Sequence, residues 1–391
     1  YYAGKVLSIV TGTRMYSLEH ISNNLTKIIN PEGGWRTFTY DSGSKLIQDE
    51  FGLLTGTFAY TDGILTGWTR GKDSEAIHTS LKPQILQGLN EPTPGTLYAE
   101  VTDGEGRTTE TRLDQYGRAL EKRLNNGVVI RTGRDGQGRV TSITDGLGRT
   151  TSFVLDHQGN ITRITNPDNT VVTMTYENGG FYSLLTSQDE EGRTTSYSYY
   201  AADGLLKSKT DAENQVTTWT YTNGLKRTIE DAEGNKTTFN YDSQRRLSSV
   251  ENALGYLTTF TYSSLGDIES VTDAEGRQTL VLHDTEGRPI MITNPEGKTS
   301  LIGHDASGLP VSATDELSRV STKSHTSAGL TSSKTEAVGD ALEQSTLTSH
   351  NAAGEEKSSR DAKGNWTDKK RDSTGRVVET VNALGHNQSR Y

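Results

Sequence analysis

Polar and apolar residues alternate along short stretches of this chain, with the period of a β-strand. Within residues 236–241, the side chains of Thr237, Phe239 and Tyr241 share one face. Residues 216–221 repeat the arrangement, with Trp219 among the residues on that face. Alternation of this kind, in segments rich in β-branched and aromatic residues, predicts half-buried strands of about six residues.

A second run of residues follows each of these strands and carries an aliphatic side chain two residues before the next turn. The aliphatic positions are Ile143, Ile164, Ile229, Val250, Val271 and Ile292. Each pair of strands therefore has one modest apolar stripe and one polar face. No amphipathic stretch is long enough to predict a helix.

The turns recur with a period of about 21 residues, which is the signature of a repeat architecture. A second turn lies about ten residues after each of the first, as in Tyr241-Asp242, so one period is one β-hairpin. Asp is expected to cap its own turn through a backbone N–H two residues on, and Gly to take the positive-φ position. The residues that open the periodic turns are Asp103, Asn125, Asp145, Asn166, Asp189, Asp211, Asp231, Asn252, Asp273, Asn294, Asp315, Glu336, Asp361 and Asn382.

The periodic turns define 13 periods, or 26 strands, between Asp103 and Asn382. At a spacing of about 4.8 Å, these strands would form a ribbon about 125 Å wide, enough for roughly one turn of a shell. A longer step between Glu336 and Asp361 predicts an insertion of four residues in one loop.

Two regions of different regularity are expected. Residues 1–100 form irregular early repeats, and prolines at 83, 92 and 94 predict a loop or an insertion on the sheet edge near residues 71–97. Residues 101–391 form the regular repeats, and the chain is interpreted as a piece of a longer protein, truncated at both ends.

Composition narrows the fold further. Only 31% of the residues are hydrophobic and the mean hydropathy is -0.66, which predicts an extended sheet with little interior. With 41 Gly, 8 Pro and 17 Tyr, the chain favours strands joined by tight turns.

Charge and cysteine content exclude several classes of function. The net charge of -10 argues against nucleic acid as a partner, and the absence of cysteine excludes disulfides and thiolate metal sites. No apolar run is long enough to span a bilayer. The first five residues, Tyr-Tyr-Ala-Gly-Lys, lack the features of a signal peptide.

The alternating phrases resemble those of RHS/YD-repeat proteins over roughly residues 25–391. The phrases are Tyr241-Asp242, Asp273-Ala274-Glu275-Gly276-Arg277 and Asp284-Thr285-Glu286-Gly287-Arg288. This family includes bacterial polymorphic toxins, shell components of insecticidal toxin complexes, wall-associated proteins and teneurins. The resemblance implies an all-β fold, in which hairpins spiral into a large hollow barrel that in toxin members encloses a toxin domain. It also implies a bacterial protein that is secreted or held at the cell surface, with its export signal outside these residues.

The chain departs from toxin shells in one respect. Those shells usually end in a plug with an Asp-Pro self-cleavage motif, and this sequence has no Asp-Pro dipeptide. Neither cleavage nor an enclosed cargo is therefore assigned to this chain from the resemblance.

No catalytic residue, cofactor-binding residue or metal ligand is predicted, and no cofactor is expected. His283, His304, His325 and His350 occupy the Tyr position of successive units, about 10 Å apart, which is too far to share one ion. The alternatives are a pH response or metal binding, and both are less favoured than simple substitution of Tyr. The Asp-x-x-Gly turns lack the ligand spacing of EF-hand calcium loops. The Gly-x-Gly phrases at 104–106 and 136–138 precede no helix pattern.

Three functions follow, in order of preference. The first is a non-catalytic shell segment that encapsulates or delivers a polypeptide toxin or effector, together with other shell segments of the parent protein. The second is a cell-surface adhesion or carbohydrate-binding module that reads glycans or another cell's surface. It would use the irregular 71–97 region and exposed aromatic residues such as Trp35, Trp68, Trp219 and Trp366. The third, an enzyme, would require a cluster of side chains that converge in a pocket, expected within residues 1–100 where the repeat is least regular.

Overall fold

A computed structural model describes residues 4–83, 98–339, 343–382, 384–385 and 387–389. The chain is all-β, as predicted, and its strands form one antiparallel sheet in which each strand pairs with its neighbours along the chain. Within the described residues the only helix is the 3₁₀ turn η1 (Asp73–Glu75). No described helix is long and apolar enough to cross a membrane.

The less regular first part of the chain contributes nine strands to this sheet. They are β1 (Ser8–Thr11), β2 (Arg14–Ile21), β3 (Asn24–Ile29), β4 (Trp35–Tyr40), β5 (Leu46–Phe51), β6 (Leu54–Thr61), β7 (Ile64–Arg70), β8 (Ile77–Lys82) and β9 (Tyr98–Asp103). Strand β8 lies within the segment where prolines predict a loop or insertion, and it pairs with β7 and β9. Pro92 and Pro94 lie outside the described residues.

The regular repeats supply the remaining strands. They are β10 (Thr108–Leu113), β11 (Ala119–Arg123), β12 (Val129–Arg134), β13 (Val140–Thr144), β14 (Thr150–Leu155), β15 (Ile161–Thr165), β16 (Val171–Tyr176), β17 (Leu184–Gln188), β18 (Thr194–Tyr199), β19 (Leu206–Thr210), β20 (Val216–Thr222), β21 (Leu225–Glu230), β22 (Lys236–Tyr241), β23 (Leu247–Glu251), β24 (Leu257–Tyr262), β25 (Ile268–Thr272), β26 (Gln278–His283), β27 (Pro289–Thr293), β28 (Thr299–His304), β29 (Pro310–Thr314), β30 (Val320–His325), β31 (Thr331–Glu336), β32 (Gln344–His350), β33 (Glu356–Arg360), β34 (Trp366–Arg371), β35 (Val377–Asn382) and β36 (Asn387–Ser389). The predicted run of 26 strands between Asp103 and Asn382 corresponds to β10–β35.

The turns have the predicted chemistry. In the turn that Asp273 opens, Oδ1 accepts N–H groups from Glu275 at 3.0 Å and Arg277 at 2.9 Å. Gly276 sits at φ 78°, in the region that side chains disfavour. The Arg side chain adds a contact that the turn prediction lacks, because its Nε donates to the same Asp through Oδ2 at 2.7 Å. Ten turns share this Asp–Arg pair, and each one ties both ends of the turn to a single carboxylate.

A register shift precedes the second turn of most hairpins, at the position where Tyr recurs. The Tyr262 hydroxyl donates to the Leu247 carbonyl at 2.7 Å, and Tyr176 and Tyr199 make equivalent bonds to the preceding hairpin. This recurring residue therefore joins each hairpin to the one before it, in addition to the strand ladder.

The two faces of the sheet differ as the alternation predicts. One face carries aromatic–aliphatic pairs across neighbouring strands, such as Phe239 with Val250 and Phe260 with Val271. The other carries hydrogen-bonded hydroxyls, including Thr261 with Ser270. No side chain of the described residues is both large and fully buried. The prediction of a sheet with little interior is therefore confirmed.

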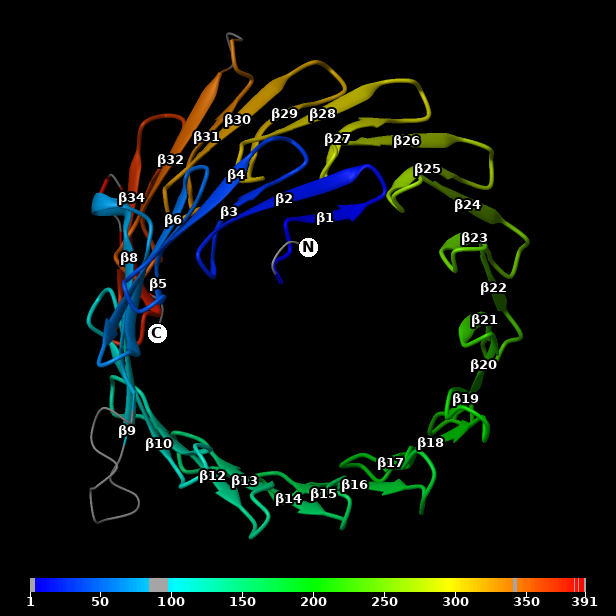
Figure 1. The fold of residues 1–391 in the computed structure, drawn as a ribbon. Coiled ribbons are helices and arrows are strands. Elements are labelled where there is room, and N and C mark those ends of the chain that lie inside the picture. Colours follow the sequence, from blue (N-terminus) through cyan, green and yellow to red (C-terminus); the bar gives the residue numbers. More distant parts are fainter. Residues whose placement is uncertain (1–3, 84–97, 340–342, 383, 386, 390–391) are drawn as a thin grey trace.

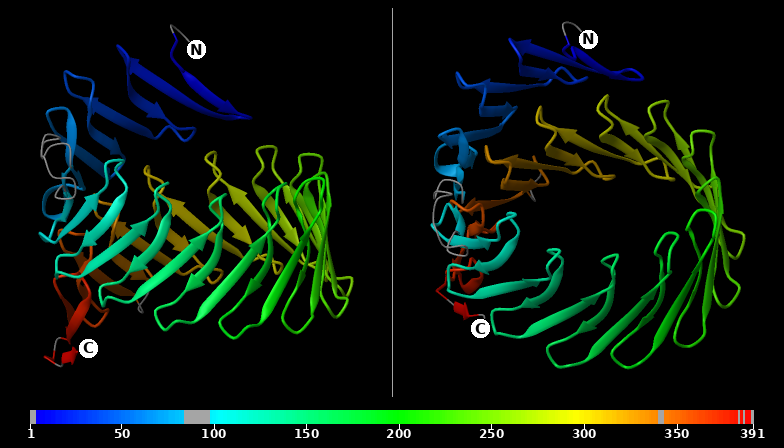
Figure 2. Two further views of the ribbon diagram at one scale, coloured as in Figure 1. Left: turned by 90° about the horizontal axis from the view of Figure 1, so that it is seen from below. Right: turned by 60° about the horizontal axis from the view of Figure 1, so that its bottom comes forward.

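The sheet curls into a ring around an open space and then continues past its own beginning (Figure 1). The first strands, β1–β6, lie beside the strands from β24 onward, and the turned views show two successive rows of hairpins (Figure 2). The fold is thus a spiral strip, and the line where its successive rows touch is its one long-range contact region.

Candidate functional site: the seam and the space it closes

We call the contact line between the two rows the seam. The first row contributes to the seam the turns that follow its odd-numbered strands, here called odd-strand turns. They meet turns that follow even-numbered strands, the even-strand turns, from the second row. The offset is constant at 23 strands, since the turn after β5 meets the turn after β28 and the turn after β9 meets the turn after β32. One turn of the spiral therefore takes 23 strands, and at about 4.8 Å per strand its diameter is at least about 35 Å.

Serine side chains in the second row bridge into the first. Ser307 Oγ accepts the Leu53 N–H at 3.0 Å and donates to the Phe51 carbonyl at 2.8 Å. Ser327 Oγ accepts the Lys72 N–H at 2.7 Å. These bonds satisfy backbone groups at turns where the strand ladder ends.

Glutamates of the first row accept backbone N–H groups of the second. The N–H of Thr285 donates to Glu32 Oε1 at 2.8 Å, and the N–H of Ala352 donates to Glu105 Oε1 at 3.0 Å. Glu75 receives the N–H of Ser327 at 3.0 Å. In all three cases the donor is the second residue of an even-strand turn. The same hydrogen bond, from the second residue of an even-strand turn to a first-row glutamate, therefore occurs three times along the seam.

Small residues permit the backbones to approach closely at the seam. A Cβ atom placed on Gly104 would lie 1.9 Å from the Ala352 carbonyl oxygen. One on Gly52 would lie 2.3 Å from Ser307 Oγ, and one on Gly71 would lie 2.9 Å from the Ala328 Cβ. Side chains at these glycines would therefore push the rows apart.

Burial is concentrated along the seam. Eight non-glycine residues are buried among those described, and six of them lie at the seam: Asn30, Thr55, Ala76, Thr326, Ser327 and Ala328. Ala328 is 4% exposed. The seam therefore serves as the core of this fold, although it is built from small and polar side chains.

Ion pairs mark both ends of the seam. Arg14 pairs with Asp267, and its Nε donates to the Thr285 carbonyl at 2.8 Å. Near the other end, Arg107 Nη2 lies 3.0 Å from Glu355 Oε2. Opposite charges are thus matched between rows that are about 250 residues apart in sequence.

The four histidines of the Tyr position all lie beside the seam. His283, His304, His325 and His350 end β26, β28, β30 and β32, and each directly precedes a turn that the first row covers. Desolvation lowers the pKa of His350, while the carboxylates of Glu356 and Glu75 oppose that shift. The described residues contain no group of three or more His, Cys, Asp or Glu side chains that could hold a metal ion.

The other predicted candidates are dispersed over the sheet. Trp35, Trp68, Trp219 and Trp366 belong to β4, β7, β20 and β34, and Trp35 is the most exposed of them at 60%. The Gly-x-Gly phrases at 104–106 and 136–138 form hairpin turns. A hollow of about 470 Å³ places Trp68 with Phe51 and Phe58 beside the seam residue Ala328.

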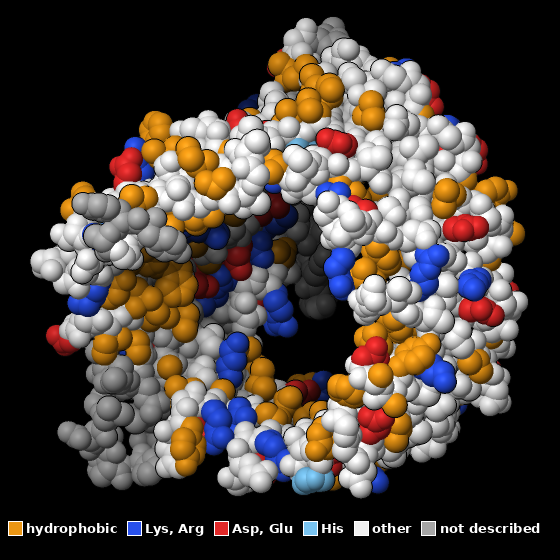
Figure 3. Space-filling model, turned by 45° about the vertical axis from the view of Figure 1, so that its right-hand side comes forward, with side chains coloured by type: hydrophobic (Ala, Val, Ile, Leu, Met, Phe, Trp, Pro, Cys, Tyr) orange, Lys and Arg blue, Asp and Glu red, His pale blue; other side chains and the backbone are white. Residues whose placement is uncertain are grey.

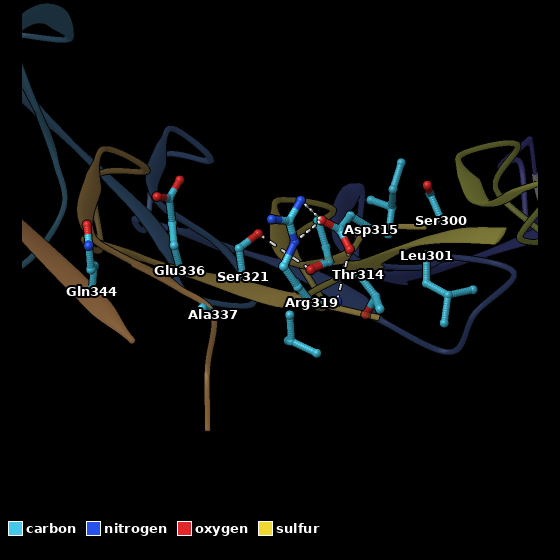
Figure 4. A pocket seen from close by; sticks show the side chains of 12 residues that line it. Ser300, Leu301, Thr314, Asp315, Arg319, Ser321, Glu336, Ala337 and Gln344 are labelled. Atoms are coloured by element: carbon cyan, nitrogen blue, oxygen red, sulfur yellow. Dashed lines mark hydrogen bonds and ion pairs between the residues drawn. The ribbon is translucent and has the colours of Figure 1, made fainter. Parts of the chain in front are cut away.

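Two further hollows contain charged residues. One, of about 660 Å³, lies on the seam and includes Arg107, His350 and Arg371. The other, of about 570 Å³, lies beside the odd-strand turn of Asp315 and Arg319, with Glu336 and Gln344 on its far side (Figure 4). The carboxylate of Asp315 there is held by the Arg319 side chain, so this pair is a turn cap.

The enclosed space is the largest feature of the molecule. In the space-filling view, the opening leads inward past Lys, Arg, Asp and Glu side chains interspersed with apolar ones (Figure 3). Because charged and apolar side chains are interspersed on this wall, neither kind of side chain covers it alone in this view.

Sequence reasoning missed the seam, although the turns carry a signal for it. Covered even-strand turns have Ser, Thr or Ala in most of their second and third positions, as in Ser327-Ala328. Several uncovered ones carry larger residues, as in Gln115-Tyr116 and His157-Gln158, although Ala201-Ala202 follows β18 in an uncovered turn. The turn residues alone therefore do not separate covered from uncovered turns.

Comparison with known proteins identifies the repeat. A family model described as RHS Repeat matches residues 134–171. No curated protein sequence matches the chain.

Solved structures are also similar to this chain. The crystal structure of TcdB2-TccC3 is 12% identical, with a TM-score of 0.64, and the match covers 94% of this chain and 26% of that one. The crystal structure of TcdB2-TccC3-TEV is 11% identical over 95% of this chain and 30% of that one, with a TM-score of 0.49. The Photorhabdus luminescens Tc holotoxin pore is 12% identical over 94% and 27%, with a TM-score of 0.37.

Only the first of these likenesses supports the fold assignment, because the other TM-scores are below 0.5. At 12% identity it concerns the fold alone. The chain spans about a quarter of the TcdB2-TccC3 chain that it matches.

Proposed function

Residues 134–171 match the RHS Repeat family, and from that premise we propose that the chain is an RHS/YD-repeat protein that forms part of a shell around a polypeptide effector. The observation that carries this proposal is the seam. A one-layer sheet that completes a turn and then bonds to itself surrounds a space without filling it. Such a wall contains a guest by excluding other molecules, and its mixed polar lining avoids holding the guest fast.

The role proposed for the chain itself is not catalytic. Many of its carboxylates cap turns or make seam contacts, and the four histidines at the Tyr position are spaced one per hairpin. Its partners would be the effector and other shell segments of the parent protein. A bacterial protein that is secreted or held at the cell surface is the setting that fits this role.

The test is limited proteolysis of the natural full-length protein, followed by mass spectrometry of the fragments. We expect a segment outside the repeats to resist cleavage while the wall is intact. Changing Ala352 to Trp at the seam should expose that segment. The matched substitution His157→Trp, in an uncovered turn, should leave it protected. Equal cleavage of every segment outside the repeats in the unaltered protein would overturn the proposal.

The adhesion alternative predicts a different result. Binding on a glycan array that is lost when Trp35 or Trp366 is changed to Ala would favour it over containment. The dispersal of the four tryptophans over distant strands gives it no comparable structural support.

A further inference from the structure

The hollow of about 470 Å³ beside Ala328, here called the aromatic hollow, has the size and lining of a small-molecule site. Such sites occupy about 300–1,000 Å³ and are lined mainly by apolar side chains with a few polar groups. Phe51, Phe58 and Trp68 come from strands of the first row, and Leu309 comes from the second row. Trp68 is 39% exposed, so its ring is accessible to a ligand. Both rows therefore contribute apolar walls to one hollow.

The strand register places two charged side chains on the same face as the aromatic ones. Gly56 is paired with Asp49 on one side and with Arg70 on the other. Two residues further along the same strand, Phe58 is paired with Trp68. Residues two apart in a strand share a face, and all five of these residues line the hollow. The two partners of Gly56 stand about 10 Å apart, with no side chain between them.

The fold itself does not require glycine at position 56. Glycine weakens a strand, and within one it marks a bulge or bend, the close approach of another backbone, or a ligand. Gly56 has no positive φ, and the ladder is in register there on both sides. An added Cβ would meet nothing closer than 3.9 Å. Gly67, Gly133 and Gly303 also lie in strands, but a Cβ on them would lie 2.9, 2.2 and 2.3 Å from the neighbouring strand. Of the reasons for a strand glycine, the approach of a ligand remains for Gly56.

The charges around the hollow leave one cation without a partner. Arg36 Nε donates to Asp49 Oδ1 at 2.7 Å, and Arg36 Nη2 pairs with the other oxygen of that carboxylate. Arg70 is exposed and makes no ion pair or side-chain hydrogen bond with any residue that the structure describes. The guanidinium of Arg70 is therefore available to a carboxylate, which it can bind through two parallel N–H bonds.

We propose that the aromatic hollow binds a small organic anion with a two-ring aromatic body, of the class of aryl carboxylates. The rings would lie against Trp68 and Phe58, in the space that Gly56 leaves open. The carboxylate would accept hydrogen bonds from Arg70. Because Leu309 of the second row completes the hollow, this site forms only where the seam is closed. The inference does not depend on whether the enclosed space holds an effector.

The test is a ligand-observed NMR titration of the unaltered chain with three probes. Naphthoate should bind about tenfold more tightly than naphthylmethanol, because hydrogen bonds between charged groups add to the same ring contacts. Methyl glucuronide carries its carboxylate on a saturated ring. It should bind about tenfold more weakly than naphthoate, because it cannot stack on the aromatic side chains.

Two variants of one residue test whether the ligand occupies the gap in the strand. Gly56→Leu fills the gap with a side chain, and naphthoate should then bind at least about tenfold more weakly. Gly56→Ala adds only a Cβ, for which there is room, and should change the affinity by less than about twofold. Circular dichroism and urea midpoints check that both variants remain folded.

A second set of variants tests the two contacts separately. Arg70→Gln should reduce the affinity for naphthoate to that for naphthylmethanol and leave the affinity for naphthylmethanol unchanged. Arg163→Gln, which changes an exposed arginine of β15, is the control for charge. Trp68→Ala should weaken the binding of both probes. Trp366→Ala changes a tryptophan of similar exposure, 42%, outside the hollow and should weaken neither.

Four results would overturn the proposal. Equal affinity of the unaltered chain for naphthoate and naphthylmethanol would exclude a site for anions. Unchanged binding to the Gly56→Leu variant would place the ligand elsewhere. Tighter binding of methyl glucuronide than of naphthoate would indicate a saccharide site instead. The fourth is the absence of binding at millimolar naphthoate.

Discussion

The seam and the single-layer wall of residues 129–262 are built from the same hairpins but are stabilised differently. No non-glycine residue of the wall is buried, whereas six lie buried at the seam. The wall is held by its strand ladder and by carboxylates that cap most of its turns. At the seam, turns that cap themselves in the same way also pack against a second row.

The difference shows that one repeat unit can serve two environments through changes at two or three turn positions. Both regions have a polar residue that caps the turn and a residue with positive φ, usually Gly, because the turn requires both features. The side chains of the second and third turn residues are not needed to form the turn. At the seam, their size determines whether the backbone of the opposing row can approach. Substitutions at these positions separate the two regions most sharply.

The largest difference is expected for glycines in the second turn position. Gly104 meets the Ala352 carbonyl, while the equivalent Gly136 has nothing within 4 Å of an added Cβ, and neither has a positive φ. Gly104→Leu should lower the free energy of unfolding by about 3 kcal/mol through overpacking, and Gly136→Leu by less than about 0.5 kcal/mol. Urea denaturation followed by tryptophan fluorescence measures both. Equal losses would mean that the seam does not form in solution.

The next effect concerns the caps of the wall. Asp145 Oδ1 accepts N–H groups from Leu147 and Arg149, each at 2.9 Å, and the Arg149 side chain donates to its other oxygen. Asp145→Ala should cost about 1 kcal/mol, as the loss of a helix cap does. Arg149→Ala removes only an exposed pair and should cost about 0.3 kcal/mol. The two urea midpoints should therefore differ clearly, and a larger loss for the Arg variant would contradict this account of the turn.

A matched pair of glutamates tests the seam contact directly. Glu105 accepts the N–H of Ala352 across the seam, whereas Glu275 occupies the same position in an uncovered odd-strand turn. Glu105→Ala should cost about 1 kcal/mol, and Glu275→Ala almost nothing. Hydrogen exchange provides a second measurement, because only the first change should speed exchange of the Ala352 amide. Unchanged exchange of the Ala352 amide in the Glu105→Ala variant would show that the hydrogen bond between Ala352 and Glu105 does not form in solution.

Much of the fold could be predicted from local sequence, and the seam could not. Alternation in segments such as residues 236–241 and the Asp and Gly of each turn act within a few residues, so they specify hairpins directly. The meeting of Glu105 with Ala352 depends on curl accumulated over 23 strands, at about 16° each. An error of one degree per strand moves that meeting point by more than one strand. A local sequence pattern does not specify the rotation per strand to within one degree, so it cannot predict which turns meet.

The candidate site follows the same division. The histidines at the Tyr position are visible in the sequence, and their spacing along separate hairpins was predictable. Their location beside the seam was not, because it requires knowledge of which turns the first row covers. The role of Arg in the Asp-x-x-Gly-Arg turns was also missed, although its recurrence four residues after Asp was visible.

The smallest expected effect is a pH dependence that arises at the seam. Burial lowers the pKa of His350, against the opposing effect of Glu356 and Glu75. The unfolded chain therefore binds this proton more readily than the folded one, and stability should fall as the pH drops below about 6.5. Above that value His350 is neutral in both states and contributes no pH dependence. His350→Tyr substitutes the residue found at Tyr262, which is neutral throughout this range. Urea midpoints at pH 7.5 and pH 5.5 should differ less for this variant than for the unaltered chain. If the urea midpoint changes equally with pH in the variant and in the unaltered chain, groups other than His350 cause the pH dependence. His350 would then only replace Tyr in packing.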